Sequence, residues 1–335
     1  MGLRVGVVGL GHLGRFHAEN YAKLARKRKA AFKLTALCDV TAEGEKLARR
    51  LKTPFFRDYH ELAEQVDAVS VVVPTTLHQE VGCFFLERGI HCLIEKPLAV
   101  TQEEGEALCA AASKGKAKLQ VGHVERFNAV VRAAAPYFGR PRFIEATRIS
   151  PYPFRSTDVG VTLDLMIHDI DLLVALAGEE PSEVRAAGAP VFSPSEDVAN
   201  ARLEFPSGCI ANVTASRVSL KKERKIRIFQ DDGYFSLDLL GNHGVFIEKS
   251  EALKNGKIDP SKLNLASLGM AALTFQMDKL IKRVVLKGDK TPSLQVEQAD
   301  FIACIEEGRA PLVDGPAGLR ALRVAERVIS SMVKV

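Results

Sequence analysis

The chain has 335 residues, more than one typical hydrophobic core supports, so the sequence predicts two domains. Its 47% hydrophobic content supplies enough apolar surface for large cores and excludes a disordered chain. The net charge is only +5, tryptophan is absent and tyrosines are few, which argues against a nucleic-acid binder. This charge fits an anionic small-molecule substrate better than a polynucleotide.

The six cysteines include no C-x-x-C pair, and several lie in apolar runs, where a thiol behaves as a small hydrophobic group. This usage favours a reducing compartment. A zinc site from Cys83, His91 and Cys92 is the weaker alternative, and we expect no metal. The first strand begins near residue 4, without room for a signal peptide, and no apolar run is long enough to span a membrane. We therefore expect a cytoplasmic protein with no membrane partner.

The first part of the chain alternates between strands and helices. A strand, a tight turn and a helix are expected over 3–24, and further strands over 32–40, 67–76, 91–98 and 117–127. Helices are expected between them, over 43–51, 77–89 and 102–114. Continuous Val, Ile and Leu runs separated by helices predict a doubly wound parallel sheet, the Rossmann arrangement, over residues 1–122.

The pattern changes near residue 140. Strands are expected over 140–150, 182–191, 197–205, 209–218, 223–230, 233–240 and 244–250, without a helix between 182 and 249. Alternating polar and apolar residues predict an antiparallel sheet with one buried face. A long loop is expected over 252–268, and helices over 269–287, 295–307 and 317–333. The second domain is therefore expected to be α/β and to cover 123–335, with its C-terminal helix able to pack back on the first domain.

A glycine-rich turn lies directly after the first strand. Gly9 permits the tight turn, Gly11 lets the backbone approach a pyrophosphate, and Gly14 allows close helix packing. The N–H groups at the start of the following helix, at His12 and Leu13, favour an anion. In this context the turn predicts a dinucleotide site.

Acidic and polar residues follow the next strands. Asp39 ends the second strand, where a carboxylate accepts hydrogen bonds from the ribose hydroxyls and repels a 2′-phosphate, so NAD is predicted over NADP. The alternative is an Asp that only caps the next helix. Pro74, Thr75 and His78 follow the third strand and are expected at the cofactor, although a Thr here can equally cap a helix.

The chemistry is predicted from two further segments. Glu95 and Lys96 end the fourth apolar strand, where the alternative is a surface ion pair. Asp164, His168 and Asp171 share one face of a helix, because residues i, i+4 and i+7 do. Asp169 lies off that face and is expected to take no part.

These motifs in this order resemble the Gfo/Idh/MocA family, named after glucose–fructose oxidoreductase, inositol dehydrogenase and a rhizopine-catabolism protein. The resemblance runs from the glycine-rich turn through Asp39 and Glu95-Lys96-Pro97 to Asp164-x-x-x-His168. It implies a Rossmann domain and a C-terminal α/β domain with a large, open, mainly antiparallel sheet. That sheet commonly mediates oligomerisation, so a homodimer or homotetramer is expected.

The resemblance also implies the site residues. It gives Lys96 the task of orienting the reacting hydroxyl, His168 that of general base, and Asp164 that of orienting His168. Imidazole titrates near neutral pH, as a base for alcohol oxidation requires, and a nearby ammonium stabilises a developing alkoxide. Glu95 and Lys96 are also expected at the cofactor. Many relatives carry Gly-Gly before the Asp and a Gly two residues after it, whereas Gly160-Val161 and Met166 stand here, so the local backbone is expected to differ.

Arginine-containing segments surround these motifs and predict the substrate. The residues expected to contact it, besides Lys96, Asp164 and His168, are Glu125, Arg126, Asn128, Arg148, Tyr152 and Arg155. Several arginines favour a phosphate group, although at least one is expected to form a structural ion pair. The segments 122–128 and 148–171 also resemble the branch that oxidises the 3-hydroxyl of UDP-N-acetylglucosamine. Alternatives are an inositol or aldose dehydrogenase and, in another class, a non-catalytic NAD-binding sensor.

Overall fold

The computed structural model describes residues 2–27, 32–152, 159–259 and 280–334. It forms two compact units. The first contains Met1–Phe127 and Thr291–Arg327, and the second contains Asn128–Lys290 and Val328–Val335. The ranges expected from the sequence were contiguous, whereas these units are not, because the chain returns to the first unit near residue 291. No helix in the described ranges is both long and apolar enough to cross a membrane.

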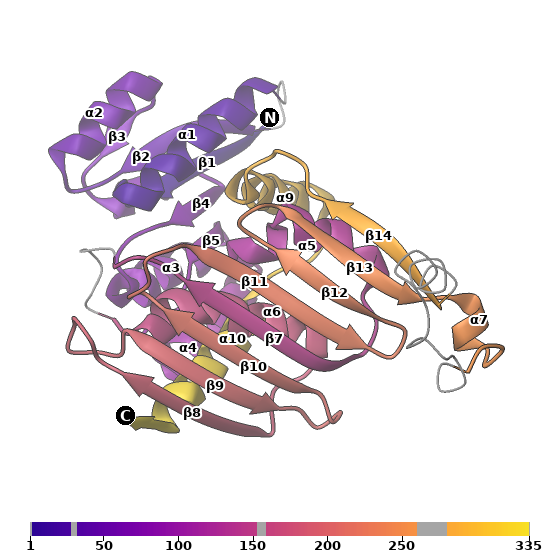
Figure 1. Cartoon of the computed structure of the whole chain (residues 1–335). Coiled ribbons are helices and arrows are strands. Elements are labelled where there is room, and N and C mark those ends of the chain that lie inside the picture. The colour runs from indigo at the N-terminus through magenta and orange to yellow at the C-terminus, as the bar shows by residue number, and fades with distance from the viewer. Residues whose placement is uncertain (1, 28–31, 153–158, 260–279, 335) are drawn as a thin grey trace. The chain divides into compact units, whose positions relative to one another are not determined.

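The first unit is built on a six-stranded sheet in the order β3-β2-β1-β4-β5-β6 (Figure 1). Every pairing in it is parallel. Its strands are β1 (Leu3–Val8), β2 (Phe32–Cys38), β3 (Phe55–Phe56), β4 (Ala68–Val71), β5 (His91–Glu95) and β6 (Leu119–Gly122). The predicted Rossmann sheet is confirmed, and the sequence missed only the two-residue strand β3.

Helices connect these strands and extend the unit. They are α1 (His12–Lys27), α2 (Ala42–Leu51), α3 (His78–Leu86), α4 (Gln102–Gly115), α9 (Ser293–Glu307) and α10 (Gly315–Ser330), the last ending in the second unit. Single turns η1 (Tyr59–Leu62), η2 (Thr75–Leu77) and η3 (Val124–Phe127) complete it. Thr41 and Thr101 cap α2 and α4 by accepting hydrogen bonds from backbone N–H groups.

The core of the first unit includes a helix from the far end of the chain. Phe301 and Ile302 of α9 are fully buried with Val5, Tyr21 and Leu93 in one cluster. Helix α9 packs on α1. Val5 and Ile302, which are 297 positions apart, therefore share one core, which is why this unit cannot be one continuous stretch of sequence.

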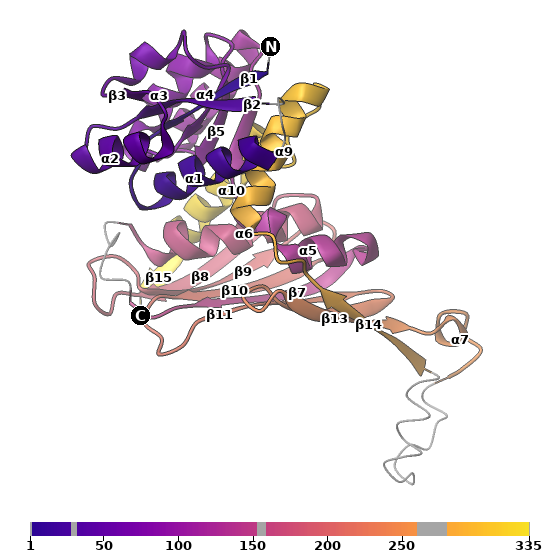
Figure 2. The same ribbon diagram turned by 90° about the horizontal axis from the view of Figure 1, so that it is seen from above.

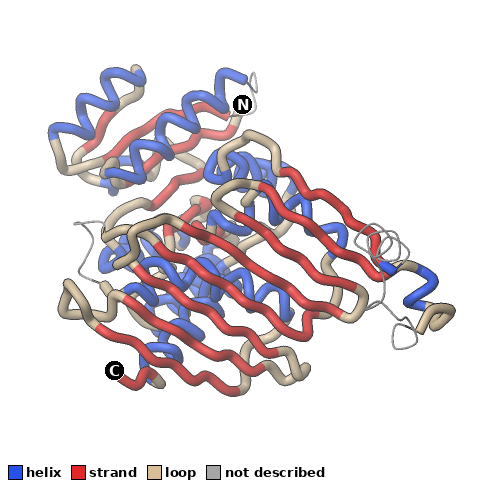
Figure 3. The backbone as a smooth tube through the Cα atoms, viewed as in Figure 1, coloured by secondary structure: helices blue, strands red, loops and turns tan. Residues whose placement is uncertain are grey.

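The second unit is built on a nine-stranded sheet in the order β14-β13-β12-β11-β7-β10-β9-β8-β15. Figure 3 shows these strands as one broad sheet. Its strands are β7 (Pro141–Ile149), β8 (Glu183–Ala189), β9 (Val198–Glu204), β10 (Ile210–Ser216), β11 (Glu223–Gln230), β12 (Gly233–Asp238), β13 (His243–Lys249), β14 (Ile281–Lys287) and β15 (Met332–Lys334). Most pairings are antiparallel, as predicted, but β10 pairs with β7, and β15 with β8, in parallel.

One face of this sheet carries two helices of the unit. Helix α5 (Ala129–Ala134) packs on β12 to β14, and α6 (Ile167–Ala177) packs on β7 and β10. Figure 2 shows both on the same side of the sheet. Along β7, Ile144, Ala146 and Arg148 are buried, while Glu145 and Thr147 alternate with them and face the opposite side. None of the described helices lies over that opposite face, so it is open in this unit.

Three predictions for the C-terminal part need correction, the first being the helix expected over 317–333, which ends at Ser330 before strand β15. The helix expected over 269–287 is wrong for 281–287, which form strand β14 beside β13, and 269–279 lie outside the described residues. Pairing with β13 provides hydrogen bonds that a sequence period cannot anticipate. The loop expected over 252–268 begins with a short helix, α7 (Glu251–Lys254), and its part beyond residue 259 also lies outside the described residues. The remaining turns of the unit are η4 (Ala135–Tyr137) and η5 (Thr162–Met166).

Candidate active site

The glycine-rich turn has the geometry that a dinucleotide requires. Gly9 has a φ of 88°, and a Cβ atom there would lie 2.4 Å from the carbonyl oxygen of Val72. A Cβ atom at Gly14 would lie 1.9 Å from the carbonyl oxygen of Gly9. Gly11 has nothing within 4 Å of that position, and His12 and Leu13 beside it are exposed. The start of α1 is therefore open to an anion.

Asp39 is held by backbone donors at the end of β2. Its carboxylate accepts hydrogen bonds from the N–H of Leu10 and, at 2.7 Å, from the N–H of Thr41. The alternative of a helix cap is wrong, because the N-cap of α2 is Thr41. Gly44 lies directly behind this carboxylate, and a Cβ atom there would be 2.6 Å from the Cβ of Asp39.

A pocket of about 550 Å³ opens between the glycine-rich turn and α2. It is lined by Leu10, Gly11, His12, Arg15, Thr41, Glu43, Lys46, Leu47 and Arg50. The cations complement a pyrophosphate, and Asp39 lies next to both Leu10 and Thr41. These residues fit the adenosine and pyrophosphate portions of NAD, which when bound accepts a hydride at its nicotinamide ring.

His78 lies beneath the turn that follows β4. Its Nδ1 atom is 3.0 Å from the carbonyl oxygen of Pro97, and its Nε2 atom is 3.0 Å from that of Val73. Burial lowers the pKa of this imidazole, although these carbonyls act to raise it. The side chain is 1% exposed. The cofactor contact expected of His78 therefore needs correction: both ring nitrogens face backbone atoms, and the ring links the turns after β4 and β5.

Pro74 and Thr75 form the surface of the turn after β4. Pro74 is exposed and Thr75 is half-buried. Pro74 occupies the N-cap position of η2, and neither η2 nor α3 has a side-chain cap. The capping alternative for Thr75 is therefore wrong, and its contact with the cofactor stays a prediction.

Glu95 and Lys96 point in different directions at the end of β5. Glu95 is 7% exposed and is not a surface residue, so the alternative of a surface ion pair is wrong for its carboxylate. Its Oε1 atom lies 2.9 Å from Nε2 of His17, on α1, and its Oε2 atom accepts a hydrogen bond from the N–H of Lys96 at 3.2 Å. The peptide bond between Lys96 and Pro97 is cis. Lys96 is half-buried.

In the second unit, Asp164 and His168 lie on a helix that begins with a wider turn. The N–H of Ile167 contacts the carbonyl oxygen of Thr162, five residues earlier, which makes η5 a π-helical turn. Asp164 lies in that turn, and His168 lies in the first turn of α6; both are half-buried. Four residues make close to one full turn in either helix type, so both project toward similar directions. Single π-helical turns are frequent at functional sites.

A buried ion pair anchors the segment that leads into η5. Arg217 donates from Nε to Asp197 at 2.7 Å and from Nη1 to the carbonyl oxygen of Val159 at 2.7 Å. Both charged side chains are fully buried. Glu196 accepts two further hydrogen bonds. Its backbone carbonyl oxygen accepts from the N–H of Val161, and its carboxylate accepts from the N–H of Thr162. The loop before β9 therefore fixes the start of the helix that carries Asp164.

Arg148 and Asp169 form a second buried pair, which ties α6 to β7. Two parallel hydrogen bonds of 2.8 Å join their side chains, which are 2% and 3% exposed. The substrate contact expected of Arg148 is therefore corrected: it is the structural ion pair that the sequence led us to expect among these arginines. Asp169, which was expected to take no part in the site, holds this helix to the sheet instead. Asp171 is buried, consistent with the structural role expected for it.

The other substrate candidates occupy varied environments. Asn128 caps α5 through the N–H of Val130 and donates to the carbonyl oxygen of Leu239, so its amide already serves the fold. Glu125 is buried and Arg126 half-buried. Tyr152 is half-buried, with its ring edge-on to Phe192 at a centroid distance of 5.4 Å, and Arg155 lies outside the described residues. Tyr152 and Arg126 therefore keep the side-chain exposure that a substrate contact needs.

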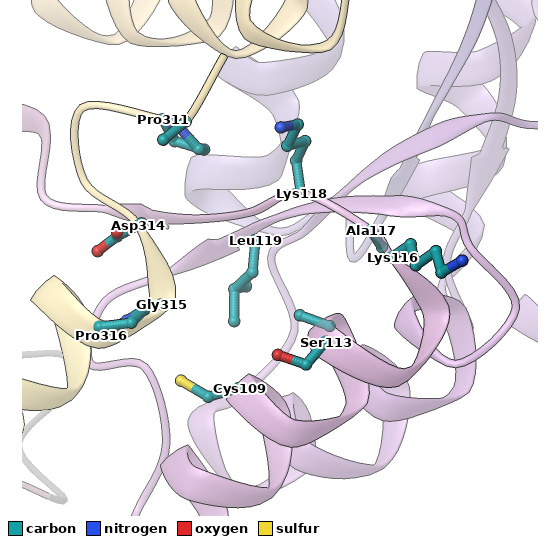
Figure 4. A pocket seen from close by; sticks show the side chains of 12 residues that line it. Cys109, Ser113, Lys116, Ala117, Lys118, Leu119, Pro311, Asp314, Gly315 and Pro316 are labelled. Carbon is teal, nitrogen blue, oxygen red and sulfur yellow. The ribbon is translucent and has the colours of Figure 1, made fainter. Parts of the chain in front are cut away.

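A further pocket, of about 320 Å³, lies elsewhere in the first unit, where α4 ends (Figure 4). Lys116, Lys118 and Leu119 line it together with Asp314 and Gly315. Leu119 begins β6, so this pocket lies at the amino end of a parallel sheet. The cofactor residues follow the carboxyl ends of the strands, where ligands of such sheets bind, so this pocket is separate from the cofactor end.

The sequence did not predict several residues that fix the segments carrying the candidate site residues. His17, Asp197, Arg217 and Glu196 lie outside the motifs and contact them through the fold. Only His17 gave a signal, since it stands three residues after Gly14 on the face that α1 turns toward the sheet.

Two matches to known families cover most of the chain. Residues 3–123 match the family described as "Oxidoreductase family, NAD-binding Rossmann fold", and residues 124–236 match the "GFO/IDH/MocA C-terminal domain". Among curated proteins, the chain is 35% identical over 328 residues to UDP-N-acetylglucosamine 3-dehydrogenase of Acidithiobacillus ferrooxidans, covering 97% of this chain and 96% of that protein. It is 31% identical over 236 residues to scyllo-inositol 2-dehydrogenase (NAD(+)) of Bacillus subtilis, covering 65% and 68% of the two chains.

Solved structures agree with these matches. A crystallised UDP-N-acetylglucosamine 3-dehydrogenase from A. ferrooxidans superposes with a TM-score of 0.85 at 34% identity, covering 99% of this chain and 98% of that one. Levoglucosan dehydrogenase in complex with NADH and levoglucosan gives a TM-score of 0.82 at 18% identity, over 99% and 97% of the chains, which shows a shared fold alone. The chain therefore belongs to the Gfo/Idh/MocA family of NAD-dependent oxidoreductases and is a dehydrogenase.

Proposed function

We propose that this dehydrogenase oxidises the 3-hydroxyl of UDP-N-acetylglucosamine with NAD, giving the 3-keto sugar nucleotide. The observation that carries the proposal is the 35% identity, over nearly the full length of both chains, to an enzyme of that name. The arginine-containing segments fit a substrate with a diphosphate better than a neutral polyol.

Three residues carry the proposed chemistry. His168 takes the proton of the reacting hydroxyl as general base, Asp164 orients His168, and Lys96 stabilises the developing alkoxide and positions the hydroxyl. Oxidation removes one proton and one hydride from the carbinol group, so a base and an oxidised nicotinamide balance the reaction. Arg126, Tyr152 and Arg155 are proposed to contact the sugar nucleotide, and Glu125 to support that contact from its buried position.

The proposed place of the enzyme follows from its product. A 3-keto sugar nucleotide is a substrate for an aminotransferase, which would give a 2,3-diamino sugar of the kind that forms lipid A with amide-linked acyl chains. We propose that the enzyme works in the cytoplasm. We also propose that it is a homodimer or homotetramer formed through the open face of the nine-stranded sheet.

The test is turnover with defined substrates. Purified enzyme is incubated with NAD and UDP-N-acetylglucosamine, with an aminotransferase and its amino donor present to remove the ketone, and the absorbance of the reduced cofactor is followed. We expect turnover that free N-acetylglucosamine, glucose and myo-inositol do not match. Good turnover with myo-inositol and none with the sugar nucleotide would favour the second candidate, an inositol dehydrogenase, which the 31% identity to scyllo-inositol 2-dehydrogenase supports.

Variants test the three residues. Lys96→Ala and His168→Ala should each lower kcat by a factor on the order of 10² to 10⁴ while NAD still binds, because general acid–base groups contribute about that much. NAD binding is measured by titration of the full-length variants. If both variants kept full activity, the proposed roles would be wrong, and NAD binding by a wild type that turns over no substrate would indicate a sensor.

A further inference from the structure

A buried pair of polar side chains in the first unit has no part in the mechanism above. His17 lies on α1, and its imidazole is fully buried. Its Nε2 atom is 2.9 Å from Oε1 of Glu95, at the end of β5. Burying two such groups costs free energy that their contact only partly recovers, so a purely apolar pair would stabilise the fold at least as well.

The carboxylate of Glu95 connects two parts of the proposed site. Its other oxygen, Oε2, accepts a hydrogen bond from the backbone N–H of Lys96 at 3.2 Å. His17 lies three residues after Gly14, on the helix that begins at the glycine-rich turn. One side chain therefore joins the helix of the cofactor turn to the backbone of the lysine.

The neighbouring strand leaves room for this contact. Gly122 on β6 pairs with Glu95, and a Cβ atom at Gly122 would lie 2.9 Å from both carboxylate oxygens. Any larger residue at position 122 would push the carboxylate away from His17 or from the N–H of Lys96. The space is fitted to an inward-pointing carboxylate.

The protonation states suit a directed hydrogen bond. Burial acts to raise the pKa of Glu95. The hydrogen bond and charge of His17, together with the charge and N–H of Lys96, lower it by more. The pKa is therefore below its usual value, and the carboxylate is ionised. Nδ1 of His17 has no hydrogen-bond partner among the described residues. An N–H group on Nε2 of His17 therefore donates a hydrogen bond to the carboxylate of Glu95 at 2.9 Å.

The same turn is held from its other side. His78 contacts the carbonyl oxygens of Pro97 and Val73. The N–H of Lys96 thus donates to Glu95, and the carbonyl oxygen of Pro97 lies 3.0 Å from Nδ1 of His78.

We propose that His17 is a positioning residue for Lys96, acting through the carboxylate of Glu95. It fixes the backbone of residue 96 relative to the helix of the cofactor turn, so that the ammonium group meets the reacting hydroxyl in one geometry. This rests on the role of Lys96 in the proposed function. A displacement of about 1 Å in such a group lowers the rate by a factor on the order of 10².

The test compares three variants of the full-length enzyme. His17→Leu removes the hydrogen bond, and His17→Gln retains an N–H donor near the position of Nε2. Tyr21→Phe is the matched control, since it removes another buried hydrogen bond of α1, to Ser70 at 2.9 Å, one turn further along. Thermal unfolding of each variant is measured alongside kcat and KM.

We expect His17→Leu to lower kcat by a factor of about 10 to 10². The primary isotope effect with substrate deuterated at C3 should also rise, because hydride transfer becomes slower than product release. His17→Gln should retain most of kcat, and Tyr21→Phe should keep both kcat and the isotope effect whatever its stability. If His17→Leu only lowered the unfolding temperature and left kcat and the isotope effect unchanged, the inference would be overturned.

A double-mutant cycle separates this inference from the proposed function. In the Lys96→Ala background, His17→Leu should cause little further loss of kcat, because the residue it positions is gone. Additive losses would overturn the inference and leave the role of Lys96 intact, whereas full activity of Lys96→Ala would overturn that role itself. If His17→Leu does not fold, Gly122→Ala, which displaces the same carboxylate, takes its place in the cycle with the same expectations.

Discussion

At the scale of single residues, the cofactor end separates side chains that reach the surface from side chains that lie beneath it. His12 and Pro74 are exposed, while Glu95 and His78 are buried and bonded to other parts of the fold. All four stand in motifs that predict proximity to the cofactor. The position of a residue in a motif does not determine where its side chain points. That direction depends on partners outside the motif, such as His17 for Glu95.

Gly44 offers a test of how tightly Asp39 is held. Gly44→Ala places a methyl group 2.6 Å from the Cβ of Asp39, so the carboxylate must shift away from the N–H groups of Leu10 and Thr41. A charged hydrogen bond contributes about 1.5 to 3 kcal/mol. Partial loss of the bond to the ribose should raise KM for NAD about tenfold and leave kcat nearly unchanged, as steady-state kinetics with varied NAD would show.

The matched control is another crowded glycine. Gly82→Ala, in the middle of α3, places a methyl group 2.5 Å from Leu108 and 2.7 Å from Ile94, away from the adenosine pocket. It should lower the unfolding temperature and leave KM for NAD unaltered. Equal increases of KM in both variants would mean that Gly44 acts through general destabilisation.

At the scale of elements, the second unit uses two buried ion pairs to fix the helix that carries His168. Arg148 and Asp169 tie α6 to β7, and Arg217 and Asp197 hold the segment that leads into η5. Breaking a buried pair by removing one partner costs about 3 to 5 kcal/mol, while replacing both partners with apolar residues is often neutral. This difference separates a structural role from contact with the substrate.

The pair between Arg148 and Asp169 can therefore be tested as a unit. Arg148→Met alone should lower the free energy of unfolding by about 3 to 5 kcal/mol, and the double variant with Asp169→Leu should recover most of it. Urea denaturation measures both. The recovered double variant should also have a KM for the sugar nucleotide close to that of the wild type; a large increase would restore Arg148 as a substrate contact.

Asp197 predicts a pH dependence of stability. Burial acts to raise its pKa. Hydrogen bonds from the N–H groups of Phe192, Ser193 and Val191 and from the guanidinium of Arg217 outweigh this effect, so the pKa lies well below its usual range. Because the folded pKa lies below the unfolded value of about 3.9, the stabilisation is complete above that pH and is lost as the pH falls toward the folded value.

The variant Asp197→Asn measures that contribution. At pH 7 it should be less stable than the wild type by about 3 to 5 kcal/mol, since it leaves Arg217 buried without a counter-charge. The difference should shrink as the pH is lowered below about 4, where unfolding curves of both proteins are compared. A difference that stayed constant down to the most acid pH would show that the charge of Asp197 is not its source.

At the scale of the whole molecule, one face of the nine-stranded sheet carries none of the described helices. It contains a shallow pocket lined by Glu145, Thr147, Asn212, Thr214, Glu223, Lys225 and Arg227. Residues of both charges alternate with small polar ones, which suits self-complementary contact about a two-fold axis. Phe143, Phe229 and Tyr234 add an aromatic cluster to the same sheet, with centroid distances of 5.9 and 4.7 Å.

A single substitution that places a large charged side chain on this face tests whether the enzyme oligomerises through it. Thr147→Arg should shift the enzyme from dimer or tetramer toward monomer in light scattering coupled to gel filtration, because it places a long cation at the centre of the face. Asn255→Arg, in the exposed turn after α7, is the control and should keep the wild-type mass. A monomeric wild type, or an unchanged mass of Thr147→Arg, would contradict the proposal.

Local patterns in the chain predicted the parallel sheet and the cofactor turn correctly, and they also yield the residues that we propose carry the chemistry. These features are local, because the period of apolar residues, the spacing of the glycines and the residues at strand ends each depend on only a few neighbouring positions. The same locality made Asp39, Lys96 and Asp164-x-x-x-His168 recognisable, and it made the strands between 182 and 249 predictable from alternation.

How those residues are held depends on contacts between distant parts of the chain. The tertiary structure brought α9 into the core of the first unit and turned 281–287 into a strand, because β13 supplied a partner. It assigned Arg148 to Asp169, turned His78 inward, and placed His17 behind Glu95. Each of these outcomes depends on a contact between residues distant in sequence, and such contacts leave no period or motif in the chain.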